Sequence, residues 1–168
     1  MAVLRCLLLA AVLAAVWGCG AGHLDRRTRD SLRGATRVEV FRIDGMTDPF
    51  EKARPEEKRI DGYSVIAQGK DRGKEFGARL ADLLDDRGTY SDAYAKCYQP
   101  GVAFRAWKGE EAADILICFM CDNLYYGPPT DRARENASFL GSPRRAAILR
   151  LAKEALPDDA EIQALRDK

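Results

Sequence analysis

The sequence predicts an α+β fold in which an antiparallel sheet of about four strands has two main helices packed against it. Three observations predict it. Residues 36–44 and 60–68 alternate apolar and polar side chains, as half-buried strands do. Two later apolar segments flank a short charged turn and predict a hairpin. Finally, two stretches repeat their apolar residues with the period of a helix. We expect a single α+β domain over residues 36–168.

The first two strands are separated by a loop. In residues 36–44 the apolar side chains are Val38, Val40, Phe41 and Ile43, and charged residues stand between them. Residues 45–58 contain two prolines and four acidic residues with no period, which is typical of a loop. Residues 60–68 then form the second strand, which ends at Gly69.

The hairpin is the most ordered pattern in the chain. Residues 101–107 and 113–120 flank the turn 108–111. A loop centred on this turn sets three cross-strand pairs: Trp107 opposite Ala112, Arg105 opposite Asp114, and Ala103 opposite Leu116. Residues 115–120 are apolar on both faces, which predicts a central strand that is covered on both sides.

One helix is expected after each pair of strands. The first covers residues 71–86, with Asp71 as its cap and Gly88 closing it. The second starts at Ser142 and Pro143, an N-cap followed by a first-turn proline, and stops at Pro157. Three less regular segments are expected as a turn or extended exit (125–129) and as shorter helices (131–139 and 158–166).

Composition narrows the classes of function. The 168 residues carry 27 Lys and Arg against 26 Asp and Glu, so the basic excess that nucleic-acid binding requires is missing. His23 is the single histidine, and no pair of carboxylates is placed for acid–base work. We therefore expect a non-enzymatic protein that has no nucleic-acid partner.

The N-terminus resembles an export signal. Arg5 precedes a run of twelve apolar residues, 6–17, and residues 1–18 are expected to form the signal peptide. As a helix the run would reach about 18 Å, which is too short for a hydrocarbon core of about 30 Å. Val16-Trp17-Gly18-Cys19 resembles a bacterial lipobox, so Cys19 is expected to be acylated, with palmitate among its acyl chains. The alternative is secretion after cleavage at Ala21 or Gly22.

The N-terminal prediction sets a location. Residues 19–35 are polar and basic, and we expect them to be a lipidated N-terminus and tether. The protein is then a membrane-anchored lipoprotein of the bacterial cell envelope that faces the periplasm or the exterior. The alternative is a soluble secreted protein. The membrane, reached through the lipid anchor, is the one partner that the sequence indicates.

Three further cysteines are the main chemical feature. In an oxidising compartment a disulfide is the expected state. The hairpin register places Tyr98 opposite Cys121, so a one-residue bulge would bring Cys97 to Cys121. A Cys97–Cys118 bond is the other pairing, and the third thiol would then be buried.

Two other uses of these cysteines stay open. Cys97, Cys118 and Cys121 could bind zinc as three thiolates, although residues three apart on a strand point to opposite faces. Cys118 and Cys121 could also form a redox pair, although no helix follows them to lower a thiol pKa. We expect no cofactor, with zinc as the alternative.

Arg105 and Trp107 are weak candidates for ligand binding. Both lie on the hairpin near the cysteines, where a pocket could form. The more frequent role for Arg105 is a cross-strand ion pair with Asp114.

Two segments of the hairpin carry a resemblance: residues 96–105, with Cys97-Tyr98-Gln99-Pro100 and Arg105, and residues 114–121, with Cys118-Phe119-Met120-Cys121. They resemble small, uncharacterised bacterial exported proteins and lipoproteins that have a Cys-aromatic-x-Pro…Arg hairpin and a Cys-Phe-x-Cys strand. The likeness covers about residues 60–125. Those proteins place His or Arg after the proline, where this chain has Gly101-Val102, so a shared metal-ligand role is not implied. The resemblance implies location and fold region, and no activity.

The function expected from the sequence is that of a cell-envelope lipoprotein with a binding or structural domain, whose ligand or protein partner the residues do not name. The alternative is a periplasmic zinc-binding or redox protein acting through Cys97, Cys118 and Cys121.

Overall fold

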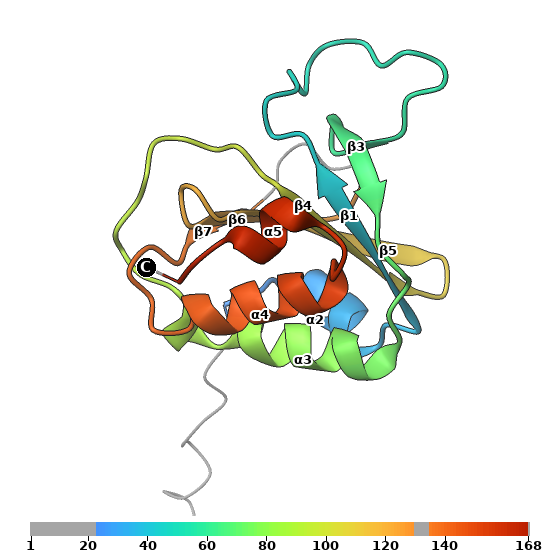
Figure 1. Cartoon of the computed structure of the whole chain (residues 1–168). Helices are drawn as coiled ribbons and strands as arrows, with labels where there is room; N and C mark the ends of the chain where they lie inside the picture. Colours follow the sequence, from blue (N-terminus) through green and yellow to red (C-terminus); the bar gives the residue numbers. More distant parts are fainter. Residues whose placement is uncertain (1–22, 130–134, 168) are drawn as a thin grey trace, which may run out of the picture.

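A computed structural model describes residues 23–129 and 135–167. Its centre is one antiparallel sheet of seven strands, in the order β2-β3-β1-β4-β5-β6-β7. The sheet is strongly curled, like half of a barrel (Figure 1). The strands are β1 (Arg37–Ile43), β2 (Arg59–Ile60), β3 (Tyr63–Gln68), β4 (Val102–Lys108), β5 (Glu111–Cys118), β6 (Asn123–Gly127) and β7 (Glu135–Ser138). The expected fold of four strands and two main helices is therefore wrong, because the sheet dominates the structure.

Three extra strands explain the difference. The expected strand 60–68 is divided by a tight turn in which Asp61 and Gly62 both have positive φ, 52° and 86°, so it becomes the β2–β3 hairpin. The expected exit at 125–129 is largely β6. The expected helix at 131–139 contains β7, which pairs with β6, and residues 130–134 lie outside the described part of the chain.

The hairpin prediction is confirmed. Strands β4 and β5 pair with the expected register: Trp107 opposite Ala112, Arg105 opposite Asp114, and Ala103 opposite Leu116. Gly109 adopts a φ of +62° in the turn, a conformation that glycine reaches without strain. Strand β5 lies between β4 and β6, and after its first residue every side chain is buried, as its apolar sequence predicts.

Both main helices exist, although each starts later than expected. Helix α3 (Lys74–Asp85) has Gly73 at its N-cap, whereas Asp71 forms an ion pair with Arg37. Helix α4 (Arg145–Ala155) follows a turn in which the Ser142 hydroxyl accepts a hydrogen bond from the Arg144 N–H. Each main helix is followed by a short one: α3 by the 3-10 turn η2 (Arg87–Thr89), which contains Gly88, and α4 by α5 (Ala160–Ala164).

The expected tether is also corrected, because much of it belongs to the folded domain. Helix α2 (Arg26–Arg33) starts at Asp25, whose carboxylate accepts from the Thr28 N–H. Leu32 and Ala35 are fully buried, and Arg29 forms an ion pair with Asp85 of α3 at 2.8 Å. The sequence pattern missed this helix because its buried face contains Thr28 and Ser31 beside a single leucine.

The sheet separates two apolar cores. Helices α2, α3 and α4 cover one face, where Val40, Phe104, Ile117 and the inner sides of the helices form the larger core (Figure 1). The smaller core on the other face contains Phe41, Ala103 and Leu116, and Tyr98 packs against it. In the described residues, no helix is long and apolar enough to cross a membrane.

Candidate functional site

The cysteines meet at one corner of the molecule. Cys97 and Cys121 are joined in a disulfide, with a Cα–Cα distance of 5.9 Å. Of the two expected pairings, this is the one that the structure contains. The bond ties residues 90–101, which follow η2, to the turn between β5 and β6. Cys118 is a free, buried thiol whose sulfur accepts from the Cys121 N–H at 3.2 Å.

A buried ion pair that sequence reasoning missed fixes the same turn. Arg145 and Asp122 are 3% and 1% exposed, and Arg145 Nε lies 2.8 Å from Asp122 Oδ1. Arg145 also donates from Nη2 to the Phe119 carbonyl oxygen and from Nη1 to that of Arg166. The pair therefore holds α4, the β5–β6 turn and the C-terminal residues together. Nothing in the sequence distinguishes Arg145 from the exposed arginines around it.

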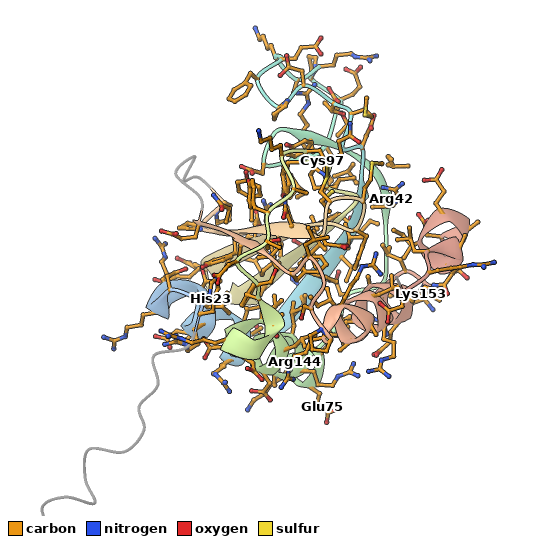
Figure 2. The ribbon with its side chains drawn as sticks, turned by 90° about the vertical axis from the view of Figure 1, so that its left-hand side faces the viewer. His23, Arg42, Glu75, Cys97, Arg144 and Lys153 are labelled. Atoms are coloured by element: carbon orange, nitrogen blue, oxygen red, sulfur yellow. A yellow bond between two sulfur atoms is a disulfide. The ribbon has the colours of Figure 1, made fainter. Side chains whose placement is uncertain are left out.

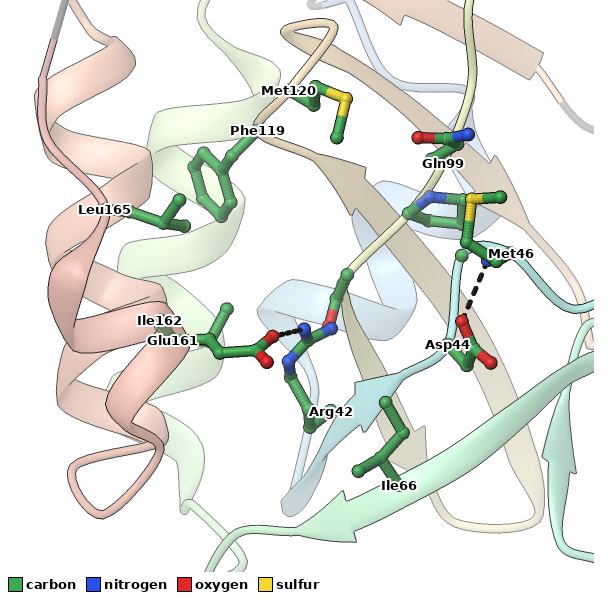
Figure 3. A pocket seen from close by; sticks show the side chains of 13 residues that line it. Arg42, Asp44, Met46, Ile66, Gln99, Phe119, Met120, Glu161, Ile162 and Leu165 are labelled. Atoms are coloured by element: carbon green, nitrogen blue, oxygen red, sulfur yellow. Dashed lines mark hydrogen bonds and ion pairs between the residues drawn. The ribbon is translucent and has the colours of Figure 1, made fainter.

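A groove opens beside this corner, and we call it the end groove. It lies between the ends of β1 and β3, the β5–β6 turn and α5, and its volume is about 520 Å³ (Figure 3). Its polar lining includes Arg42, Asp44, Gln99 and Glu161. Its apolar lining is Met46, Ile66, Pro100, Phe119, Met120, Ile162 and Leu165. The volume falls within the range of roughly 300–1,000 Å³ that is usual for ligand pockets.

Exposed apolar side chains gather around the end groove. In the described residues, five large hydrophobic or aromatic side chains are exposed. Three of them line the groove: Met46, Ile66 and Met120, which are 74%, 60% and 68% exposed. Phe50 lies in the same 45–58 loop as Met46. Single exposed apolar residues are common on protein surfaces, but a group that rims a hollow is a candidate interaction site.

Arg42 is held rigidly in the groove. Its Nη1 donates to the carbonyl oxygens of Ile43 at 2.7 Å and Gly101 at 2.9 Å. Its Nη2 donates to Glu161 (Figure 3). Its Nε lies 3.5 Å from a carboxylate oxygen of Asp159. Its side chain is 14% exposed. Arg42 thus anchors α5 to the end of β1, and its hydrogen-bonding groups are used within the protein.

The candidate residues Arg105 and Trp107 lie elsewhere, on the face of the sheet that is opposite the helices. Arg105 forms two hydrogen bonds with Asp114, from Nε at 2.6 Å and from Nη2 at 2.8 Å, which raise the pKa of Arg105. Trp107 donates from Nε1 to Glu39 at 2.7 Å. The cross-strand ion pair expected for Arg105 is therefore present. Neither residue lines the end groove.

In the described residues, neither a metal-binding cluster nor the single histidine contributes to the groove. In the described ranges 23–129 and 135–167, no group of three or more His, Cys, Asp and Glu side chains is placed to hold a metal ion. His23 stacks on Tyr90, with 3.7 Å between ring centroids, and Figure 2 shows it well apart from Arg42. Burial and the nearby Arg87 lower the pKa of His23. Cys19 lies outside the described residues.

No family model, no curated protein and no solved structure matches this chain. The resemblance to exported proteins of unknown function therefore stays an expectation, and the chemistry of the site rests on its own residues.

Proposed function

We propose that the protein is a non-enzymatic domain of the bacterial cell envelope. It binds a partner whose apolar side chains insert into the end groove. The observation that carries the proposal is the gathering of Met46, Ile66 and Met120 around that groove. Methionine side chains adapt to differently shaped apolar partners because they are unbranched and polarisable.

The construction of the groove also supports binding. The disulfide and the Arg145–Asp122 pair fix the β5–β6 turn on one side, and Arg42 fixes α5 on the other. Stable walls under flexible rim side chains lower the ordering cost of binding. Among the described residues that line the groove there is no histidine or cysteine, and the one arginine is occupied by internal partners.

The cellular location is part of the proposal. The apolar run before Cys19 and the Gly18-Cys19 junction support export and lipid anchoring. A disulfide between Cys97 and Cys121 agrees with this location, because such bonds persist in oxidising compartments. The anchor would leave the folded domain in the periplasm or outside the cell.

The test uses the exported protein held in phosphatidylcholine nanodiscs and a fluorescein-labelled peptide of alternating leucine and serine. Replacing both Met46 and Met120 by Ser should weaken peptide binding about tenfold or more, because two apolar contacts are lost. Fluorescence anisotropy measures the affinity. Phe50→Ser is the matched control, since Phe50 is 83% exposed in the same loop but does not line the groove. Equal binding by the double variant, or an equal loss in the control, contradicts the proposal.

The alternative function, zinc binding or redox chemistry through Cys97, Cys118 and Cys121, draws support from their position at one corner. It requires the Cys97–Cys121 bond to open, since a disulfide leaves only the Cys118 thiol. Mass spectrometry after alkylation, with and without reductant, distinguishes the two states. Three alkylated thiols at these positions without reductant, together with stoichiometric zinc, would favour the alternative.

A further inference from the structure

We infer that the partner segment that enters the end groove is basic as well as apolar, so that it resembles one face of a cationic amphipathic peptide. The inference rests on the proposed function and adds the chemical class of the partner. It follows from the charges that surround an otherwise apolar hollow.

Acidic side chains outnumber basic ones in the two segments beside the groove. Two segments border it: residues 44–61, which include the loop, and residues 156–167, which include α5. Together they contain ten acidic and five basic side chains. Of the lining residues in the described part of the chain, Arg42 is the one that is basic, and Asp44 and Glu161 are acidic. Arg42 is paired with Asp159 and Glu161, so these three side chains together carry one net negative charge, and Asp44 adds a second.

The two carboxylates keep capacity for a ligand. The Glu161 side chain is 80% exposed, and its bond to Arg42 uses Oε2. Asp44 accepts from the Met46 N–H through Oδ1 at 2.9 Å. A carboxylate accepts hydrogen bonds at both oxygens, so each can take an ammonium or guanidinium group through its second oxygen. Figure 3 shows Asp44 and Glu161 on opposite sides of the hollow.

The same charges disfavour anionic ligands. A fatty-acid carboxylate or an acidic peptide would meet Asp44 and Glu161, and it would have to displace Glu161 to reach Arg42. Helix α2, by contrast, carries four arginines and one aspartate in eight residues. Three of these arginines are paired with Asp30, Asp82 and Asp85. The carboxylates at the groove, rather than α2, would therefore orient a basic partner.

Two labelled peptides test the inference: alternating leucine and lysine, and the same peptide with glutamate in place of each lysine. Binding is measured by fluorescence anisotropy to the exported protein in phosphatidylcholine nanodiscs, whose zwitterionic lipid attracts neither peptide strongly. We expect the lysine peptide to bind more tightly than the glutamate peptide, and the difference to shrink as salt rises. Glu161→Gln and Asp44→Asn should each lower the affinity for the lysine peptide about threefold, as expected for partly exposed charge pairs.

Glu110→Gln is the matched control, because Glu110 is exposed in the β4–β5 turn and does not line the groove. It should leave the affinity unchanged. Equal affinity for the two peptides, tighter binding of the glutamate peptide, or no effect of the two groove variants overturns the inference. In those cases, the variant in which Ser replaces Met46 and Met120 is compared with the wild type. If it binds both peptides more weakly, the groove still binds apolar segments and only the charge preference fails. If it weakens neither peptide, the proposed function fails as well.

Discussion

Apolar side chains are buried on the helix-covered face of the sheet, whereas several are exposed at the end groove. Under α2, α3 and α4, Phe104, Ile117 and their neighbours are sealed from water. At the end groove Met46 and Met120 are more exposed than buried. Both regions belong to the same curled sheet, so the difference lies in what covers them. Three helices close the first region, whereas the short α5 covers the second only in part.

This contrast implies that the helix-covered face contributes mainly to stability and the end groove mainly to binding. A sealed side chain contributes its full burial to folding, and an exposed one contributes little until a partner covers it. Polar contacts lie between the two regions, where Arg145 and Arg42 bind the β5–β6 turn and the end of β1 to the C-terminal helices. Substitutions in the two regions should therefore affect different measurements.

The largest expected effect is in the helix-covered face. Phe104→Ala removes a fully buried ring that packs against Phe76 and should lower the free energy of unfolding by about 3–5 kcal/mol. Met120→Ala at the groove should change it by less than about 0.5 kcal/mol. Urea denaturation of both variants measures the difference. Comparable losses would mean that the groove rim is part of the core.

Removal of the disulfide should have the next largest effect. The bond joins residues 24 apart, and replacing both Cys97 and Cys121 by Ala should cost about 3 kcal/mol of stability through the larger entropy of the unfolded chain. Reductant should destabilise the wild-type protein and leave the double variant unchanged. Thermal unfolding with and without dithiothreitol measures both. An unchanged wild-type midpoint in reductant would show that the bond does not support the groove wall.

The helix-covered face could be predicted much better than the end groove. The β4–β5 register follows from the position of one short charged turn, so local sequence determines it. Strand β7 does not follow in the same way, because its four residues form a strand by pairing with β6. Helix α2 was missed because arginines fill its exposed face and a single leucine, Leu32, marks its buried side.

The groove residues could not be predicted at all from local pattern. Met46 comes from a loop, Ile66 from an edge of the sheet and Met120 from a turn, and only the curl of the sheet brings them to one hollow. Arg42 comes three residues after Glu39, so it lies on the same face of β1 as Val38 and Val40, and its side chain is mostly buried. The contact between Cys97 and Cys121 could be predicted, because the hairpin register places the two residues close together.

A smaller effect is expected in the pH dependence of stability, and it arises in the helix-covered region. His23 lies beside α2 and α3, and burial lowers its pKa below the ordinary 6.5 in the folded protein. The folded state therefore resists protonation, so this contribution to stability is complete above pH 6.5 and is lost as pH falls through the lowered pKa. As pH falls from 7 to 5, the unfolding midpoint of the wild type should fall more than that of His23→Gln. A constant difference would show that His23 is not buried against Tyr90.

The smallest effect is expected on the groove side, in the loop that carries Met46. Hydrogen bonds from Arg59 and Ser64, and one from the Arg54 N–H, lower the pKa of Glu57 from 4.5 to about 2. Since the folded pKa is depressed, the stabilisation is present above pH 4.5 and disappears as pH falls toward 2. An NMR titration should give a midpoint of about 2 for Glu57. Glu57→Gln should speed amide exchange at Val65, which donates to the Lys58 carbonyl oxygen, while amides of β5 remain protected. Faster exchange in β5 as well would mean that the loop and the sheet open as one unit, so that the groove rim could not adapt to a partner independently of the core.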